Sequence, residues 1–188
     1  MSKAQRIMVF FILSGLFLVI GPYVFYAWWK PVAQVNKGEL LETRSAGLQL
    51  LALEGVIPVK MLSESVKKKW VFLTVQVANC DARCQKKLYL MRQIRIAQGE
   101  NMDRLERVWV ILGDGQPDPQ LLKIHPGLLL ARAPTLASLA QLPLSTDSGA
   151  YIFLIDPLGN LVMRYDDKSE PKDILKDISR LLRFSGIG

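Results

Sequence analysis

The longest uninterrupted run of apolar residues lies close to the start of the chain. Residues 7–29 include no charged side chain and consist mostly of Phe, Leu, Ile and Val, a run long enough to cross a bilayer as a helix. Gly21-Pro22 is expected to kink this helix, which membrane helices tolerate. Aromatic residues gather at its C-terminal end, as they do at membrane–water interfaces: Tyr23, Tyr26, Trp28 and Trp29. The pattern predicts a transmembrane helix at residues 7–29, preceded by a short tail at residues 1–6.

A cleaved signal peptide is the main alternative for this segment. The apolar run exceeds the core of a typical signal peptide, and Ala27-Trp28-Trp29 lacks the small-x-small pattern of a cleavage site. A buried helix of a soluble protein is a further alternative, but the run has no polar face. The sequence therefore favours an uncleaved membrane anchor.

Beyond a juxtamembrane linker at residues 30–46, short apolar runs alternate with amphipathic stretches. Short apolar runs predict buried strands, and apolar residues three and four positions apart predict helices. The expected strands are 71–77, 107–112, 128–130, 151–155 and 161–165, preceded by a hairpin made from 48–53 and 58–62. The expected helices are one that ends near residue 98, then 117–124, 134–142 and a last one with Ser169 as cap and Pro171 in its first turn. This order predicts an α/β fold at residues 47–185, a thioredoxin-like central mixed sheet flanked by helices.

The two cysteines of the chain, Cys80 and Cys84, lie where the 71–77 strand gives way to a basic, amphipathic helix. A thiol at a helix N-terminus lies near the positive end of the helix dipole, which favours thiolate. The neighbouring charges are mainly basic: Arg83, Lys86 and Lys87 against Asp81. On a regular helix this spacing separates the Cα atoms by about 6 Å of rise, which a disulfide can span. A structural disulfide or two inert thiols remain alternatives, although a loop this short restricts the unfolded chain little.

The charges that flank the apolar run predict the orientation of the chain. Lys3 and Arg6 precede it, and the positive-inside rule places this tail in the cytoplasm, although Lys30 and Lys37 weaken the asymmetry. In a Gram-negative bacterium, this arrangement is a single-pass protein of the bacterial inner (cytoplasmic) membrane. Its N-terminus is cytoplasmic and its C-terminal domain is periplasmic, where thiols can be oxidised.

The formal net charge is +7, and without Lys3 and Arg6 the chain carries 22 basic against 17 acidic residues, a net charge of +5. This excess fits a solvated basic surface, and it would also suit anionic headgroups of the membrane lipid bilayer or an acidic partner. Nucleic acid is an unsuitable partner outside the cytoplasmic membrane.

Two motifs, together with the anchor, carry a resemblance to a known family. Residues 69–73, Lys-Trp-Val-Phe-Leu, lead into Cys80-x-x-x-Cys84, and residues 151–159 read Tyr-Ile-Phe-Leu-Ile-Asp-Pro-Leu-Gly before a C-terminal helix. Over about residues 48–184 the chain resembles the SCO/SenC family, the membrane-anchored, thioredoxin-like proteins of cytochrome c oxidase assembly. The resemblance implies a copper(I) site made by two cysteines and a histidine, with Cys80 and Cys84 as the cysteine ligands.

The chain departs from the family pattern at two positions. The family's histidine follows an aspartate nine residues ahead of the turn proline, and the corresponding residues here are Asp147 and Ser148, counted from Pro157. Asp81 follows the first cysteine, where the family usually has proline. Serine is a poor ligand for copper(I), which thiolates and imidazole suit better. The departures favour dithiol chemistry, or a purely assisting role in oxidase assembly, over copper delivery.

The other residues that could in principle bind copper(I), the histidine and two methionines, have structural roles that explain their presence. His125, the single histidine, is expected at a helix end or turn in His-Pro-Gly, and a loop rearrangement would be needed to make it a ligand. Met91 and Met163 are expected in the hydrophobic core.

Three functions remain open. The first is an accessory factor of cytochrome c oxidase biogenesis that exchanges disulfides, in which Cys80 attacks and Cys84 resolves the mixed disulfide. Its partners would be cytochrome c oxidase subunits or copper chaperones. The second is a copper(I) carrier with a replacement third ligand, and the third is a non-catalytic scaffold with a structural disulfide. The sequence therefore leaves open whether the chain is an enzyme, the candidate activity being thiol–disulfide oxidoreductase.

Other enzyme classes lack their motifs. His125 has no identifiable nucleophile partner for a Ser-His-Asp arrangement. Gly113-Asp114-Gly115 is a turn without the rest of a Walker or dinucleotide motif. The Thr/Pro surroundings of a peroxidatic cysteine are also not evident.

Overall fold

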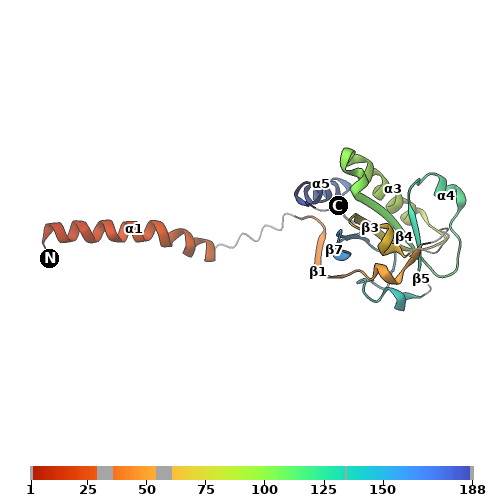
Figure 1. Ribbon diagram of the computed structural model, residues 1–188, viewed down its shortest axis with the longest axis horizontal. Helices are drawn as coiled ribbons and strands as arrows, with labels where there is room; N and C mark the ends of the chain where they lie inside the picture. Colours follow the sequence, from red (N-terminus) through yellow and green to blue (C-terminus); the bar gives the residue numbers. More distant parts are fainter. Residues whose placement is uncertain (1, 29–35, 54–60, 134, 187–188) are drawn as a thin grey trace. The chain divides into compact units, whose positions relative to one another are not determined.

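The computed structural model describes residues 2–28, 36–53, 61–133 and 135–186, which belong to two compact units, residues 1–35 and 36–188 (Figure 1). The first unit is the helix α1, Lys3–Trp28, which continues through Pro22 and has no buried residue. Among the described residues, α1 is the one helix that is long and apolar enough, by length and composition, to cross a membrane. It begins earlier than expected and takes in most of the predicted tail, and Trp29 lies outside the described residues.

The second unit is built on a mixed sheet. Within its described residues seven strands pair in the order β1-β7-β6-β3-β4-β5-β2. β3, β4 and β5 are parallel, and the remaining pairs are antiparallel. The strands are β1 Glu39–Ser45, β2 Ala52–Leu53, β3 Trp70–Val77, β4 Leu105–Leu112, β5 Leu129–Ala133, β6 Ile152–Ile155 and β7 Asn160–Tyr165. The predicted mixed sheet is confirmed.

Helices cover both faces of this sheet. The α-helices of this unit are α2 Leu62–Ser65, α3 Ala82–Ala97, α4 Pro119–Lys123 and α5 Pro171–Phe184, and the 3-10 turns are η1 Leu48–Leu50, η2 Gly99–Arg104 and η3 Leu136–Leu139. α3 and α5 lie side by side on one face, as Figure 1 shows, where Met91 and Ile178 pack against Phe72. η1, α2 and η3 cover the other face, where Leu51 and Leu62 join the core with Leu73.

β3 lies at the centre of the sheet and is buried from both sides. Seven of its eight residues are buried, which explains its mostly apolar sequence, because a central strand covered on both faces has no solvent-facing side. Each large apolar side chain buried here contributes about 1.5–3 kcal/mol relative to an exposed one. The end of β3 is therefore a rigid platform for whatever follows it in the chain.

The expected linker at residues 30–46 is wrong for its last part, because Glu39–Ser45 form the edge strand β1. β1 pairs antiparallel with β7, and Arg164 binds Glu39 through two hydrogen bonds of 2.7 and 2.8 Å. Just before β1, the backbone N–H groups of Lys37 and Gly38 donate to the buried Asp177 carboxylate at 2.8 and 2.9 Å. The folded domain thus includes residues that the sequence placed outside it.

Three local predictions are also corrected. The expected hairpin before β3 is reduced to a single bridge between Ala52 and Met61, because β2 pairs with β5 at the sheet edge; Pro58 and Val59 lie outside the described residues. The predicted 134–142 helix is only the short turn η3. Ser169 does not cap α5, since its hydroxyl binds Asp166 in the turn after β7.

Candidate functional site

The candidate site lies where β3 ends and α3 begins. The backbone N–H of Cys80 donates to the Ala78 carbonyl at 2.9 Å, and Asp81 then forms the N-cap of α3. Asp81 Oδ1 accepts a hydrogen bond from the Cys84 backbone N–H at 2.8 Å. This carboxylate satisfies a donor that the first helical turn leaves without a partner, and it suits the positive end of the helix dipole. Asp81 therefore has a structural reason to occupy the position where the resembling family has proline.

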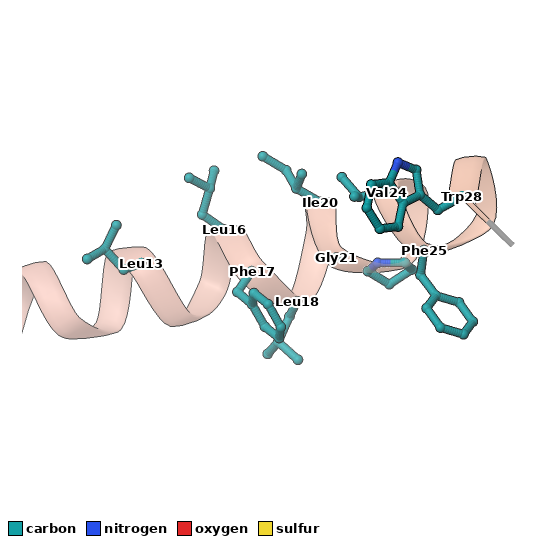
Figure 2. Close-up of a pocket in the computed structure, with 10 residues that line it drawn as sticks. Leu13, Leu16, Phe17, Leu18, Ile20, Gly21, Val24, Phe25 and Trp28 are labelled. Atoms are coloured by element: carbon teal, nitrogen blue, oxygen red, sulfur yellow. The ribbon is translucent and has the colours of Figure 1, made fainter.

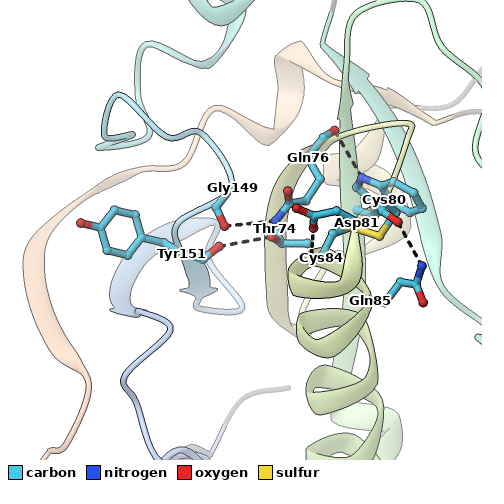
Figure 3. The surroundings of a disulfide bond; sticks show 9 residues. Thr74, Gln76, Cys80, Asp81, Cys84, Gln85, Gly149 and Tyr151 are labelled. Atoms are coloured by element: carbon cyan, nitrogen blue, oxygen red, sulfur yellow. Dashed lines mark hydrogen bonds between the residues drawn. A yellow bond between two sulfur atoms is a disulfide. The ribbon is translucent and has the colours of Figure 1, made fainter.

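Cys80 and Cys84 form a disulfide across this junction, with their Cα atoms 5.2 Å apart (Figure 3). Cys84 lies in the first turn of α3, whereas Cys80 precedes the cap and is not helical. The non-helical backbone at Cys80 brings the two Cα atoms closer than the rise of about 6 Å that a regular helix would give. The prediction that these cysteines can bridge is confirmed, and their catalytic role stays a prediction.

The two cysteines differ in their access to solvent. Cys84 is 1% exposed and packs into a cluster with Leu88 and Trp109, whereas Cys80 is 9% exposed. Cys80 also lines a hollow of about 430 Å³, called here the Cys80 pocket, whose other walls include Asn79, Gln85, Gly115, Gln116, Asp118 and Leu121. A thiol or disulfide that approaches through this pocket reaches Cys80 first.

The loop after β4 forms the far wall of the Cys80 pocket. The Arg132 guanidinium on β5 donates to the carbonyls of Gly113 and, at 2.9 Å, Gly115, which holds the loop beside the end of β3. A Cβ atom on Gly115 would lie 2.7 Å from the Cβ of Ala78, so this close approach requires glycine. On the opposite wall the Gln85 amide donates to the Cys80 carbonyl at 3.0 Å. The pocket is thus fixed by contacts on both of its sides.

Buried polar contacts hold the loop before β6 against β3. Gln76 Nε2 donates to the Gly149 carbonyl at 3.1 Å and Thr74 Oγ1 to the Tyr151 carbonyl at 3.2 Å, as Figure 3 shows. The indole N–H of the fully buried Trp109 donates to the Gln76 carbonyl at 3.4 Å. These contacts place the loop that carries Ser148 beside the β3–α3 junction.

Two of the cations on α3 are paired with acids from neighbouring loops. Arg83 binds Asp147, which lowers the pKa of that carboxyl through a hydrogen bond from the guanidinium. Lys87 is buried and pairs with Asp167, which also lies 3.5 Å from Arg83. From the sequence, Arg83 and Lys87 were expected to favour a thiolate. Their pairing offsets that effect, so the helix N-terminus and Lys86, which has no ion pair within the described residues, are the remaining contributions.

His125 lies at the end of α4, as predicted, and it lines a hollow between α3 and α4 that does not include Cys80 or Ser148. Its backbone N–H donates to the Leu122 carbonyl at 3.0 Å, and the residue is 4% exposed. Burial, with Arg107 and Arg92 nearby, lowers the pKa of His125 below its ordinary value. Within the described parts of the chain, no group of three or more His, Cys, Asp and Glu side chains could hold a metal ion.

The residues offered by this structure therefore do not fit the three-ligand copper site that the resemblance implied. Asp147 is engaged by Arg83, and Ser148 stands where the imidazole would be. Met91 and Met163 are fully buried in the core between the sheet and α5, which confirms their expected place.

Sequence reasoning found the two cysteines but missed most of the residues that position them. The role of Asp81 had a signal, because an aspartate directly before an amphipathic helix is a common N-cap. No sequence pattern indicated the roles of Gln76 and Arg132, because their contacts join segments far apart in the chain. The contact of Gln85 with the Cys80 carbonyl follows no recognisable motif either.

A wide hollow of about 930 Å³ lies along α1 and is lined wholly by apolar side chains of that helix, as Figure 2 shows. Leu16, Phe17 and Phe25 are among them, and each is more than half exposed. The hollow contains none of the polar groups that fix the orientation of a bound small molecule. We therefore regard it as the surface of an apolar helix and not as a ligand site.

The fold and the cysteine pair at the end of its central strand define a thioredoxin-like protein. The chain belongs to the family described as transmembrane-like, thioredoxin-like, C-terminal domain, whose model matches residues 70–185. No curated protein matches the sequence.

Several solved structures share this fold. Yeast Sco1 with copper bound has a TM-score of 0.58 and 16% identity, over 72% of this chain and 91% of that one. An SCO1/SenC family lipoprotein from Bacillus anthracis str. Ames has a TM-score of 0.52 and 17% identity, over 77% and 95%. A putative thiol:disulfide interchange protein DsbE from Chlorobium tepidum has a TM-score of 0.51 and 20% identity, over 78% and 98%. The predicted SCO-like, thioredoxin-like fold is confirmed; identities this low bear on the fold alone.

Proposed function

We propose that this chain is a membrane-anchored accessory factor of cytochrome c oxidase biogenesis that exchanges disulfides through Cys80 and Cys84. The observation that carries the proposal is the asymmetry of the pair. Cys80 lines the Cys80 pocket and is 9% exposed, whereas Cys84 is 1% exposed at the N-terminus of α3. An attacking thiol that a partner can reach through a pocket, beside a fully buried resolving thiol, is the arrangement that thiol–disulfide exchange needs.

The exchange proceeds in two displacements. In the reduced protein the Cys80 thiolate attacks one sulfur of a partner disulfide, which forms a mixed disulfide and releases one partner thiolate. The Cys84 thiolate then attacks Cys80 Sγ, which closes the Cys80–Cys84 disulfide and releases the second partner thiolate. The partner gains two electrons, and an external dithiol reductant returns the pair to its reduced form.

Local contacts of the pair support both steps. The N-terminal end of α3 favours negative charge on a sulfur close to it, both on Cys80, which directly precedes the cap, and on Cys84 in the first turn. Cys84 already lies at the distance of a bonded partner, since the two Cα atoms are 5.2 Å apart. The Asp81 cap and the Gln85 amide tie the backbone on both sides of Cys80, so little rearrangement is needed between the steps.

The proposed setting of the reaction is supported by α1 and by the related structures. We propose that α1 anchors the chain in a bacterial inner membrane with its N-terminus in the cytoplasm, because Lys3 and Arg6 precede the apolar run. The folded domain then lies in the periplasm, which is an oxidising compartment. Oxidase subunits or copper chaperones are the proposed partners, and the likeness to Sco1 and DsbE folds supports this setting.

Copper(I) carriage is the second candidate, because several proteins of this fold were solved with copper bound. Two thiolates are suitable donors for copper(I) when the pair is reduced. The third donor is lacking among the described residues, as shown above. The geometry therefore supports disulfide exchange better than copper delivery.

A trapping experiment tests the proposal on the full chain in non-ionic detergent. The reduced Cys84→Ser variant, mixed with a peptide that carries an internal disulfide, should accumulate a mixed disulfide at Cys80 that mass spectrometry detects. The Cys80→Ser variant is the matched control and should form little adduct, because Cys84 is buried. No adduct with Cys84→Ser, or equal adducts with both variants, would contradict the proposal. A Cys80→Ser/Cys84→Ser double variant that supports oxidase assembly normally would assign the chain a scaffold role instead.

A further inference from the structure

A second hollow adjoins the Cys80 pocket. It has a volume of about 350 Å³, lies between α3 and α4, and is called here the α3–α4 pocket; its walls include Gln85, Lys86, Tyr89, Arg92, Leu121 and His125. Gln85 and Leu121 line both pockets. A segment that reacts at Cys80 can therefore extend from one pocket into the other.

The charge of the α3–α4 pocket is positive and lacks a counterion. Lys86 is exposed and Arg92 half-buried, neither has an ion-pair partner within the described residues, and no acid lines the pocket. The other cations of α3 differ in this respect, since Arg83, Lys87 and Arg95 all contact aspartates. The two unpaired cations are thus a local exception on a helix whose charges are otherwise compensated.

Buried groups behind the α3–α4 pocket add to its positive electrostatic potential. Arg107, on β4, is 2% exposed and donates to the Pro126 carbonyl at 2.5 Å, while its Nε and Nη1 atoms have no partner among the described residues. The Nδ1 atom of His125, whose side chain lines the pocket, is likewise without a hydrogen-bond partner there. Burial, with Arg95 and Arg92 nearby, lowers the pKa of Arg107 to about 10, so the guanidinium stays charged at neutral pH. Positive charge that is partly buried, behind a pocket with no acid in its lining, attracts an anionic group more strongly than a solvated surface does.

We propose that the α3–α4 pocket receives a carboxylate of the protein whose disulfide reacts at Cys80, so that the preferred substrate is an acidic, cysteine-bearing segment. Arg92 and Lys86 would pair with the carboxylate, and the Tyr89 hydroxyl at the rim can donate a further hydrogen bond. The inference rests on the proposed exchange at Cys80. The ligand is proposed to be a protein segment because the two hollows share a wall. A carboxylate bound in the α3–α4 pocket can therefore orient a sulfur that reacts at Cys80.

The test compares three peptides of equal length with an internal disulfide, flanked by Glu, Gln or Lys. The full chain in non-ionic detergent, fully reduced, is mixed with each peptide, and the second-order rate constant of disulfide reduction is measured at low and high salt. We expect the acidic peptide to react about tenfold faster than the neutral one at low salt, with the advantage lost at high salt. A Lys86→Glu/Arg92→Glu variant should lose or reverse this preference, which is read as the ratio of the rates with the acidic and the neutral peptide, so that any effect of Lys86 on the thiolate cancels.

The matched control is Lys172→Glu/Lys176→Glu, which alters the net charge equally at two exposed positions of α5 that line neither pocket. This control should keep the preference for the acidic peptide. Equal rates with all three peptides, or a preference that both double variants lose to the same extent, would overturn the assignment of the pocket while leaving exchange at Cys80 intact. Reduction of none of the peptides by the unsubstituted chain would instead overturn the proposed exchange itself.

Discussion

Asp81 and Cys84 are joined by a hydrogen bond of 2.8 Å in which the aspartate carboxylate accepts the cysteine's backbone N–H. This contact starts α3 and places Cys84 in its first turn, with Cys80 just outside the helix. The same residue that shapes the junction also brings a negative charge close to the sulfur atoms. The carboxylate opposes thiolate formation and the helix N-terminus favours it, so the two effects act against each other at this site.

Replacing the cap should separate its two roles. Asp81→Ala removes the acceptor and is expected to destabilise the domain by about 1 kcal/mol, whereas Asp81→Asn keeps an oxygen acceptor and should lose much less. Urea unfolding of the oxidised protein, followed by circular dichroism, measures the two losses. An equal loss in both variants would mean that the charge of Asp81, and not its capping bond, stabilises α3.

The contact between Gly115 and Ala78 leads to a second prediction. A methyl group at Gly115 would lie 2.7 Å from the Ala78 Cβ, so Gly115→Ala must push the loop away from the end of β3. Such overpacking costs about 1–3 kcal/mol, and the displaced wall should also slow exchange at Cys80. Gly186→Ala is the matched control, because a Cβ there meets nothing within 4 Å. Unfolding free energy and exchange rate are the readouts, and a Gly115→Ala protein indistinguishable from the Gly186→Ala protein would contradict the close packing.

The centre of the fold could be predicted from sequence because its strands, β3 and β4, are long and mostly apolar. β3 and β4 are buried on both faces, so nearly every residue in them carries the same signal. The edge strand β1 gives no such signal, since its sequence Glu-Leu-Leu-Glu-Thr-Arg-Ser is mostly exposed and its pairing depends on the distant Arg164. Local pattern therefore identifies the core elements, and long-range pairing decides where the domain begins.

The features of the candidate site also fall into those that local sequence predicts and those that depend on long-range contacts. The cysteine spacing and the strand–helix junction are local, so it was predictable that the two cysteines can form a disulfide, as they do here. The walls of both pockets could not be predicted from local sequence, because they depend on contacts between distant segments. Arg132 reaches the 113–115 loop, and α4 packs beside α3. The pairing of Lys87 with Asp167 joins residues 80 positions apart, and no local pattern indicates it.

His125 should make the stability of the domain depend on pH. Burial first, and then Arg107 and Arg92, lower its pKa below 6.5, so the unfolded chain binds a proton at a pH where the folded chain does not. The stability that comes from keeping the imidazole neutral is fully present above the unfolded pKa of 6.5 and is lost as the pH falls through the lowered, folded pKa. His125→Gln should therefore show a shallower loss of unfolding free energy between about pH 7 and pH 5.

Two measurements check this expectation. Urea unfolding at a series of pH values compares the two proteins, and the ring proton of the single histidine reports its pKa directly by NMR. Parallel pH dependence in the two proteins, or a measured pKa at or above 6.5, would show that the ring is not held neutral by its surroundings.

Copper(I) binding separates the two leading functions, and the position of His125 makes the expected outcome specific. The histidine lies in the α3–α4 pocket beside Arg92, whose positive charge disfavours a bound cation, and Ser148 offers no imidazole. Reduced protein should therefore bind copper(I) through Cys80 and Cys84 alone, with the same affinity in the unsubstituted chain and in His125→Gln. An anaerobic titration against a chromogenic competitor measures both affinities, and Cys80→Ser/Cys84→Ser supplies the background.

Ser148→His, which places an imidazole beside the β3–α3 junction, should raise the affinity by about tenfold or more, since each added soft or imidazole donor strengthens a copper(I) site. Stoichiometric, tight binding that His125→Gln weakens would show that the loop rearranges to bring the histidine to the sulfur atoms, and copper delivery would then replace disulfide exchange as the better-supported function.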